Sequence, residues 1–182
     1  MHAVLGDFIV DCVQNSVEAG AKRIEIKILQ EPRFIGITIK DDGCGMDEGQ
    51  LVSALDPFYT NGKKHVHRKV GLGLPFLKQA MDLAGGQFRI ESKKGQGTEL
   101  VFGYDPKAVD ASPIGKLEEA FLQILLFAGN HELVINRIYK SDEGKTEEYE
   151  IVKSELLEVL GNLEQAESLI LARDFLRSQE DF

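Results

Sequence analysis

Hydrophobic residues recur every three or four positions between residues 5 and 19. This spacing places them on one side of an amphipathic helix, which ends at Gly20 because glycine readily adopts the left-handed conformation that closes a helix. The side consists of Leu5, Ile9, Cys12, Val13 and Val17. The same kind of spacing predicts a short helix over residues 47–55 and a longer helix over 72–84.

Apolar and polar residues alternate in four segments of the first 104 residues, and each is predicted to be a strand with one buried face. The segments are residues 23–28, 34–39, 87–92 and 97–104. The first two form an antiparallel hairpin around Pro32, and the last two are joined by the turn "KKGQG". Residues 56–70 are expected to be irregular. The order of elements predicts an α+β fold, with a sheet covered on one face by helices.

The composition changes at residues 105–113, a candidate linker, and a helix, a hairpin and two further helices are predicted after it. These elements span residues 114–129, 131–139, 146–152, 153–160 and 164–178. We therefore divide the chain into domains 1–106 and 107–182. The first helix and the hairpin of the second domain carry too many large apolar side chains to stand alone. We expect residues 113–152 to bury them on the first domain or on a second copy of the chain.

The 182 residues are 43% hydrophobic and 28% charged, which is typical of a globular protein. A net charge of −9 argues against a general nucleic-acid or anionic-membrane surface. The chain has neither an apolar stretch approaching the roughly 18 residues of a membrane span nor the features of a signal peptide. Two cysteines are too few for a disulfide framework. These features predict a cytoplasmic protein with reduced thiols.

Asp11 and Asn15 lie four positions apart on the first predicted helix, so their side chains leave the same face. A carboxylate and an amide facing one cavity could hold a hydrated Mg²⁺ and orient a nucleophile, because Mg²⁺ prefers oxygen ligands and keeps several waters. A helix with a solvated polar face would have the same pattern.

Asp41 ends the second strand and is followed by Gly43 and Gly45 in the string "DDGCGM". A carboxylate in this position can accept a hydrogen bond from a flat ring that carries an amine, and the glycines leave room for the ring to lie against backbone. A tight turn that requires positive φ would use the same glycines.

The string "GLGL", residues 71–74, follows a loop and opens the helix over 72–84. Glycine amides at the start of a helix can bind an anion, because the unpaired N–H groups and the helix dipole favour negative charge. Residues 63–69 carry four fixed positive charges, so the rest of the chain has a net charge of −9 − 4 = −13. This contrast favours a phosphate-facing loop over a solvated charge run. His65 and His67 lack the cysteine or carboxylate support that a transition-metal site needs.

The order of these motifs resembles the GHKL superfamily of ATP-binding domains. In chain order, the motifs are Asp-x-x-x-Asn on a helix, Asp-x-Gly-x-Gly after a strand, a loop, Gly-x-Gly at a helix start and Gly-Thr in a later strand. "NSVEAGA" is similar to the N box of MutL proteins, whereas "DPFYT" and the segment from "GLGLPF" to "GTELVF" are similar to histidine kinase catalytic domains. The resemblance covers about residues 5–104. It implies a Bergerat-type α/β sandwich, followed here by a C-terminal helix–hairpin–helix extension.

The resemblance implies a Mg-ATP site. Asn15 would bind the Mg²⁺ that bridges the phosphates, and Asp41 would accept a hydrogen bond from the adenine amine, with Thr98 supporting it through water. The amides of Gly71 and Gly73 would face the phosphates, and Lys63, with its neighbour Lys64, would contact the outer ones. The residues implied to bind the nucleotide are Asn15, Asp41, Gly43, Gly45, Met46, Lys63, Gly71, Leu72, Gly73, Leu74 and Thr98.

The departures from the family pattern concern catalysis. Asp11 stands where ATPases of the superfamily have glutamate, and its shorter side chain reaches less far toward a water. The few residues before the first helix leave no room for a dimerisation helix with a phosphoacceptor histidine, so we do not expect a self-contained sensor kinase. Three functions remain: a protein kinase acting on a separate partner, a non-catalytic nucleotide-sensing module, and a slow ATPase that works through ATP-gated dimerisation. The motifs favour an enzyme with ATP and Mg²⁺ as cofactors and a protein partner, without nucleic acid or membrane.

Overall fold

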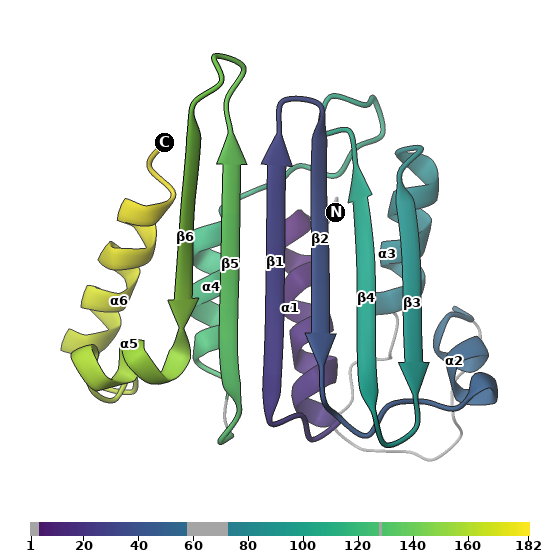
Figure 1. Ribbon diagram of the computed structural model, residues 1–182, viewed down its shortest axis with the longest axis horizontal. Coiled ribbons are helices and arrows are strands. Elements are labelled where there is room, and N and C mark those ends of the chain that lie inside the picture. The colour runs from purple at the N-terminus through teal and green to yellow at the C-terminus, as the bar shows by residue number, and fades with distance from the viewer. Residues whose placement is uncertain (1–3, 58–72, 128) are drawn as a thin grey trace.

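The computed structural model of the protein describes residues 4–57, 73–127 and 129–182. The strands of these residues are β1 (Arg23–Glu31), β2 (Phe34–Asp41), β3 (Gln87–Lys93), β4 (Gly97–Tyr104), β5 (Glu132–Lys140) and β6 (Thr146–Val152). The helices are α1 (Leu5–Glu18), α2 (Glu48–Ala54), α3 (Gly73–Leu83), α4 (Leu117–Leu125), α5 (Lys153–Leu160) and α6 (Ala166–Gln179). The strands form one sheet in the order β3-β4-β2-β1-β5-β6 (Figure 1). The predicted α+β fold is confirmed, and the sheet is mixed, because β5 runs parallel to β1 whereas the other neighbouring strands are antiparallel.

The buried face of the sheet follows from the alternation along its central strands. Ile24, Ile26 and Ile28 of β1 are buried, and the residues between them are more exposed. β2 pairs antiparallel with β1 and places its own isoleucines opposite, as in the pair of Ile26 with Ile39. Residues directly opposite in a sheet share a face, so these side chains form one apolar layer.

Helices cover that layer. Figure 1 shows α1, α3 and α4 behind the sheet, and α5 and α6 beside its β6 edge. α1 and α4 approach closely, because a Cβ at Gly6 would lie 3.1 Å from the Cβ of Ala120. The sequence predicted a sheet that helices cover on one face, and α1, α3 and α4 cover the sheet in this way.

The C-terminal segment continues the same sheet. β5 pairs with β1 in parallel, with Arg23 opposite Glu132 and Ile26 opposite Ile135, and β6 pairs antiparallel with β5. The hydrophobic residues that this segment adds to the core are Leu117, Ala120, Phe121, Leu122, Ile124, Leu125, Leu133, Ile135, Ile151, Leu163, Ala172 and Leu176. One continuous core thus includes residues from both sides of the candidate linker.

A buried cation ties the end of the chain to this half of the sheet. Arg137 is 1% exposed on the helix-facing side of β5. Its Nε donates to Glu180 at 3.1 Å, and its Nη2 donates to Gln30. Tyr149 also donates to Glu180. Because a buried charge is costly unless it is paired, these contacts hold the C-terminal end of α6 against β5 and β6.

The structure differs from the sequence prediction at α4. The predicted helix spans residues 114–129, whereas α4 spans Leu117–Leu125. Gly115 has a φ of +73°, so the chain cannot be helical there, and the amide of Leu5 donates to the carbonyl of Pro113 just before it. A search of the described residues finds no helix with the length and apolar character of a membrane span.

Candidate functional site

Asp41 lies where β2 ends, on the face of the sheet that carries the helices. It pairs with Ile24 of β1 on one side and with Thr98 of β4 on the other, and Thr98 in turn pairs with Ser92 of β3. Ser92, Thr98 and Asp41 therefore form a polar row across three strands, next to the apolar layer. A polar row in this position requires hydrogen-bond partners, and it receives them from α1 and from the turn after β2.

The Asp41 carboxylate is 8% exposed and accepts one hydrogen bond at each oxygen. The hydroxyl of Ser16, on α1, donates to Oδ2 at 2.8 Å, and the amide of Gly43 donates to Oδ1 at 2.8 Å. Ser16 is 4% exposed. An ionised carboxylate has about four lone-pair sites, so both oxygens keep capacity for a further donor.

The turn after Asp41 is fixed on both sides by backbone hydrogen bonds. The amide of Cys44 donates to the carbonyl of Ala19 at 2.9 Å, and the amide of Gly95 donates to the carbonyl of Cys44 at 2.7 Å. Gly45 has a φ of +60°, and a Cβ there would lie 2.1 Å from the carbonyl oxygen of Lys93. The turn therefore requires glycine at this position. It joins the end of α1 to the turn between β3 and β4.

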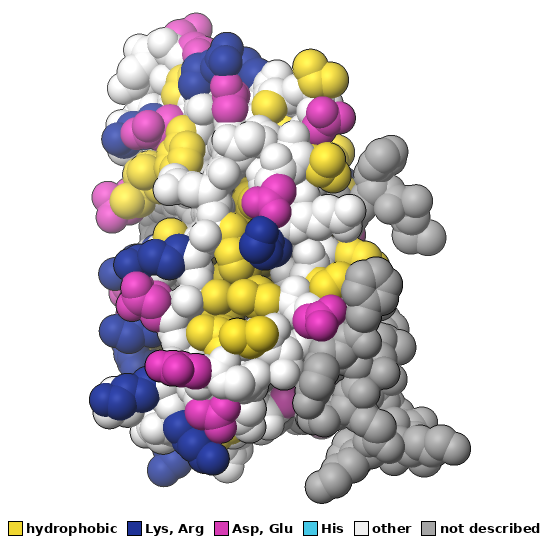
Figure 2. All heavy atoms as spheres, turned by 90° about the vertical axis from the view of Figure 1, so that its right-hand side faces the viewer, with side chains coloured by type: hydrophobic (Ala, Val, Ile, Leu, Met, Phe, Trp, Pro, Cys, Tyr) yellow, Lys and Arg dark blue, Asp and Glu magenta, His cyan; other side chains and the backbone are white. Residues whose placement is uncertain are grey.

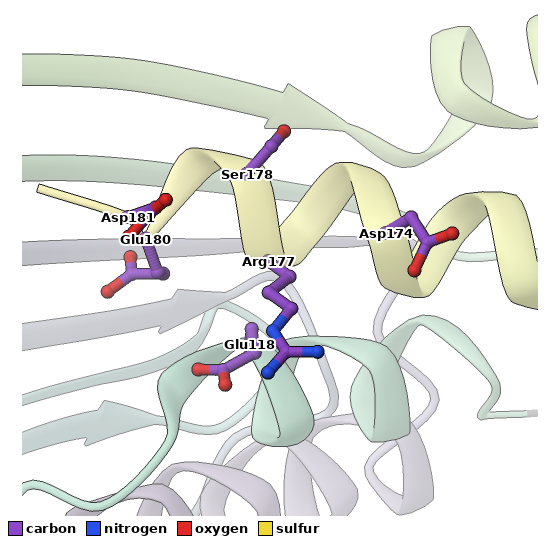
Figure 3. Close-up of a pocket in the computed structure, with 6 residues that line it drawn as sticks. All are labelled: Glu118, Asp174, Arg177, Ser178, Glu180 and Asp181. Atoms are coloured by element: carbon purple, nitrogen blue, oxygen red, sulfur yellow. The ribbon is translucent and has the colours of Figure 1, made fainter.

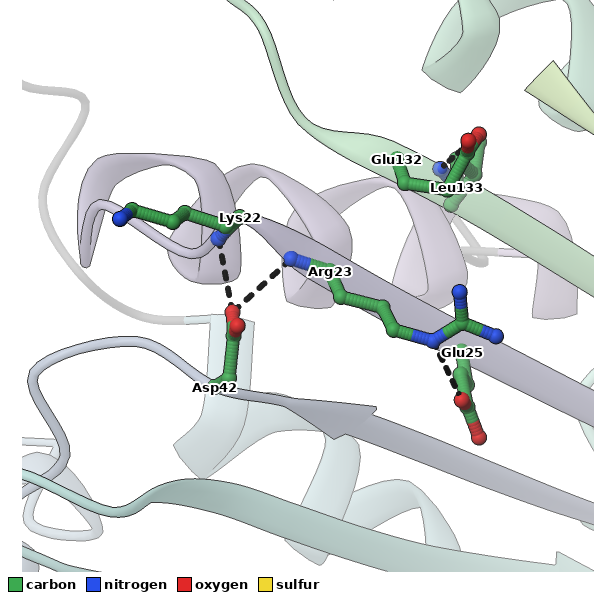
Figure 4. Close-up of polar contacts among 6 residues, drawn as sticks. All are labelled: Lys22, Arg23, Glu25, Asp42, Glu132 and Leu133. Atoms are coloured by element: carbon green, nitrogen blue, oxygen red, sulfur yellow. Dashed lines mark hydrogen bonds and ion pairs between the residues drawn. The ribbon is translucent and has the colours of Figure 1, made fainter. Parts of the chain in front are cut away.

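Asp42, in the same turn, binds the backbone at the start of β1. Figure 4 shows its carboxylate beside the backbone amides of Lys22 and Arg23, which donate to Oδ1 at 2.7 Å and 2.9 Å. The amide of Arg23, together with that of Lys22, lowers the pKa of the Asp42 carboxyl. Asp42 thus holds the start of β1, whereas Asp41 faces the helices.

The polar face of α1 lies beside the start of α3. Asp11 and Asn15 are both exposed on α1. A Cβ at Gly73, the first residue of α3, would lie 3.3 Å from Oδ2 of Asp11. Between them Cys12 points into the core, and burial, with the nearby Asp11 carboxylate, raises the pKa of its thiol to about 12. Cys12 is therefore a neutral core residue, and Asp11 and Asn15 form the part of the polar face of α1 that lies on the side of α3.

Ser92 connects the polar row to the turn. Its hydroxyl accepts from the amide of Met46 at 2.8 Å, lies 2.8 Å from Oγ1 of Thr98 and is 3.2 Å from the carbonyl oxygen of Gly97. Ser92 and Thr98 are both half-buried. The end of β3, the start of β4 and the turn after β2 therefore meet at one hydroxyl.

The predicted site residues that the structure describes come from α1, the end of β2, the following turn, the start of α3 and the start of β4. They are Asn15, Asp41, Gly43, Gly45, Met46, Gly73, Leu74 and Thr98, with Asp11 as the candidate base. Lys63, Gly71 and Leu72 lie outside the described residues, as do Lys64, His65 and His67. Their placement stays a prediction.

Sequence reasoning missed Ser16 and Ser92. A signal for each was available, because both are polar residues on a face that the periodicity assigns to the core. Ser16 follows Cys12 by four positions on the apolar side of α1, and Ser92 continues the alternation of Phe88 and Ile90. A polar residue on a buried face needs a partner, and here the partners are Asp41 and Thr98.

The surface at the β3 edge of the sheet has a charged part and a hydrophobic part. Figure 2 shows charged side chains along the sheet and hydrophobic side chains gathered in the middle of this view. Half-buried hydrophobic residues of β3 and α3, among them Phe88, Ile90 and Leu74, pack against the core. The apolar surface of this edge therefore adjoins the elements that carry Thr98 and Gly73.

A separate cavity of about 540 Å³ lies at the C-terminal end of α6. It is lined by Glu118, Asp174, Arg177, Ser178, Glu180 and Asp181. Figure 3 shows Arg177 extending from α6 toward Glu118 of α4. Four carboxylates against one guanidinium would repel a polyphosphate, so this cavity does not suit the chemistry expected at Asp41.

Comparison with known proteins identifies the family. Residues 4–108 match the model of the family described as "Histidine kinase-, DNA gyrase B-, and HSP90-like ATPase". The match includes more than half of the 182 residues. The chain belongs to this ATPase family. The resemblance to histidine kinase-like GHKL domains is thereby confirmed, and the MutL-like character of the N box stays a prediction.

Two sensor kinases are similar to this member of the ATPase family. The CAI-1 autoinducer sensor kinase/phosphatase CqsS of Vibrio cholerae is 30% identical over 115 residues, 62% of this chain and 16% of that protein. The sensor histidine kinase WalK of Bacillus subtilis is 29% identical over 101 residues, 54% of this chain and 16% of that protein. The chain thus spans a small part of the length of these relatives.

A solved structure has a fold similar to this ATPase-family chain over a longer stretch. The N-terminal domain of a DNA repair protein matches 80% of this chain and 51% of its own, with a TM-score of 0.52 and 14% identity. Because residues 4–108 supply less than 80% of the chain, the shared fold extends into the C-terminal segment.

Proposed function

We propose that this chain binds Mg-ATP at the junction of α1, β2, β4 and α3. One observation carries the proposal: Asp41 is a buried carboxylate whose two oxygens are each held by one donor, Ser16 or Gly43, and keep capacity for an amine. A Cβ at Gly43 would lie 2.9 Å from Oδ1 of Asp41 and 2.9 Å from the Cβ of Ala19, so the turn beside the carboxylate requires glycine at that position. The residues present fit an adenine nucleotide.

The residues on α1 fit the metal. Asp11 lies next to the first residue of α3, and Asn15, one turn further along α1, leaves the same face of that helix with its amide oxygen. Mg²⁺ is commonly held by one or two protein oxygens together with substrate phosphates, and it would neutralise phosphate charge when bound. The start of α3 adds the positive end of a helix dipole, which favours an anion.

We further propose that the nucleotide serves a separate protein partner, as phosphoryl donor or as the signal that controls binding. Among the residues that the structure describes, the one histidine is His131, and it is buried. Burial, with the ammonium of Lys153 nearby, lowers the pKa of its imidazole. A buried side chain in such contacts is a poor phosphoryl acceptor.

The proposal is tested by titration calorimetry of the full chain with ATP, with and without Mg²⁺, followed by incubation with radiolabelled ATP and proteins captured by the ATP-loaded chain. Micromolar Mg-ATP binding is the expected result. An acid-labile label on a captured protein indicates histidine transfer, and an acid-stable label indicates serine transfer. Nucleotide binding without label would favour the nucleotide-sensing role, and absence of binding would contradict the proposal.

Replacing Asn15 by alanine is expected to weaken Mg-ATP binding about tenfold and to change the affinity for metal-free ATP less than about threefold. The substitution removes a metal ligand and touches no part of the base. Calorimetry in Mg²⁺ and in EDTA measures both affinities. Gln14→Ala, an exposed neighbour on the same helix, is the matched control. Equal losses in the two buffers would instead indicate damage to α1.

Replacing Asp11 by glutamate is expected to raise steady-state phosphate release at least about tenfold. General-base catalysis contributes roughly 10²–10⁴-fold, and the added methylene gives the carboxylate a longer reach toward an attacking water. A coupled phosphate assay measures the rate. Gln14→Glu places a new carboxylate on the same helix and should leave the rate unchanged. An unchanged rate in Asp11→Glu would mean that the shorter side chain does not limit hydrolysis.

A further inference from the structure

We propose that Ser92 is a positioning residue of the nucleotide site. Its hydroxyl fixes the hydroxyl of Thr98 as a hydrogen-bond acceptor beside Asp41, so that the site selects a purine with an amino group at the 6-position. The inference rests on the proposed function and adds to it a residue on an edge strand that determines base specificity.

The contacts of Ser92 leave little choice for its proton. A hydroxyl has one proton and two lone pairs. The amide of Met46 can only donate, so it occupies one lone pair of Ser92, and the carbonyl of Gly97 can only accept. If the proton of Ser92 goes to Gly97, Thr98 must donate to the second lone pair of Ser92. This arrangement satisfies all three contacts at once.

The opposite arrangement is less favourable. If Ser92 donated to Thr98, the contact from Ser92 to the carbonyl of Gly97 would be lost, because the hydroxyl has no second proton. Removing a donor from a partly buried carbonyl costs stability. The network therefore turns the proton of Thr98 toward Ser92 and leaves the lone pairs of Thr98 for other partners.

The orientation of Thr98 matters because of its neighbour. Thr98 lies directly opposite Asp41 in the β2–β4 ladder, and Asp41 is an acceptor. Two acceptors side by side favour a ligand group that carries N–H bonds, directly or through a water. They disfavour a carbonyl oxygen, which would leave unpaired lone pairs facing one another. A 6-amino purine satisfies this pair, and a 6-oxo purine does not.

Ser92 also receives the amide of Met46, so a substitution could act through the turn after β2 instead of through Thr98. The two routes differ in their consequences. A displaced turn would weaken every purine nucleotide alike, since it alters the wall of the pocket. A reoriented Thr98 hydroxyl would weaken only the nucleotide that needs an acceptor at the 6-position.

The test uses the full chain and calorimetric titration with ATP, GTP and purine riboside triphosphate, which has hydrogen at the 6-position. Ser92→Ala is expected to weaken ATP binding about fivefold and to change purine riboside triphosphate binding less than about twofold. The ratio of ATP affinity to GTP affinity should fall, because the freed hydroxyl of Thr98 can donate to a carbonyl. Thr98→Val should give the same loss, and the double variant should be no weaker than either single variant.

Two controls separate this effect from a change in folding. Ser178→Ala removes an exposed hydroxyl that donates to the carbonyl of Phe175 at 2.7 Å on α6, and it should bind all three nucleotides like the wild type. Ser92→Thr keeps the hydroxyl and should restore the preference for ATP. Melting temperatures of all variants are measured in parallel.

Equal losses for ATP and purine riboside triphosphate in Ser92→Ala would overturn the inference, because they would indicate that Ser92 acts through the turn. Losses that multiply in the double variant would also overturn it, since independent residues contribute additively in free energy. Unchanged ATP affinity in Ser92→Ala would contradict the role of Ser92 and leave the proposed nucleotide binding intact. A wild-type chain that binds no nucleotide would overturn the proposed function together with it.

Discussion

Replacing Asp41 by asparagine is expected to weaken ATP binding at least tenfold while the chain remains folded. The substitution removes a charge-assisted hydrogen bond to the base, which is worth roughly 1.5–3 kcal/mol, or a factor of about ten or more in affinity. The fold should tolerate asparagine, because its carbonyl can accept from Gly43 and its amide can donate to the hydroxyl of Ser16. Calorimetry gives the affinity and thermal melting gives the stability.

Asp42→Asn is the matched control for this substitution. Asp42 is adjacent in sequence, but its carboxylate accepts from the amides of Lys22 and Arg23 at the start of β1. Removing its charge should lower stability slightly and leave ATP affinity within about twofold. If Asp41→Asn bound ATP as well as the wild type, the nucleotide site would have to lie elsewhere in the chain.

Truncation after Pro106 is expected to give an insoluble or strongly destabilised protein. The remaining chain would lose α4 from the side of α1, and β1 would become an exposed edge in place of a strand paired with β5. Burying one large hydrophobic side chain contributes roughly 1.5–3 kcal/mol, so removing the many core residues of the C-terminal segment exceeds a typical net stability of about 5–15 kcal/mol. Unpaired strand edges also promote aggregation.

Truncation after Gly161 should be milder. This fragment keeps α4, β5, β6 and α5, but Arg137 loses the carboxylate of Glu180. Breaking a buried ion pair costs about 3–5 kcal/mol, so we expect a soluble fragment that melts roughly 10 °C or more below the full chain. Soluble expression, thermal melting and ATP titration compare the two fragments. A soluble 1–106 fragment with the melting temperature and ATP affinity of the full chain would contradict this prediction and would support two independent domains.

The local elements were predictable from the sequence because their signals are local. Hydrophobic residues recur every second position in residues 23–28 and about every 3.6 positions in residues 5–19. Each repeat indicates a strand or a helix with one buried face, and it can be recognised in that segment alone. The acidic turn after β2 was also readable, because Gly43 and Gly45 follow a carboxylate at the end of an apolar strand. The positions of Asp11, Asn15 and Asp41 in the sequence are therefore enough to make them candidate site residues.

Only the tertiary structure decided which segments are neighbours. Alternation determines which face of a strand is buried, but it does not determine the strand beside it, so the parallel pairing of β5 with β1 was not readable from either segment. For the same reason the sequence left Ser16 and Ser92 unassigned. Ser16 contacts Asp41 across 25 residues, and the amide of Met46 reaches Ser92 across 46. The sequence by itself determined the elements and the chemistry available at their ends, while long-range packing decided which of these groups meet, because contacts between distant segments leave no periodic signal in either one.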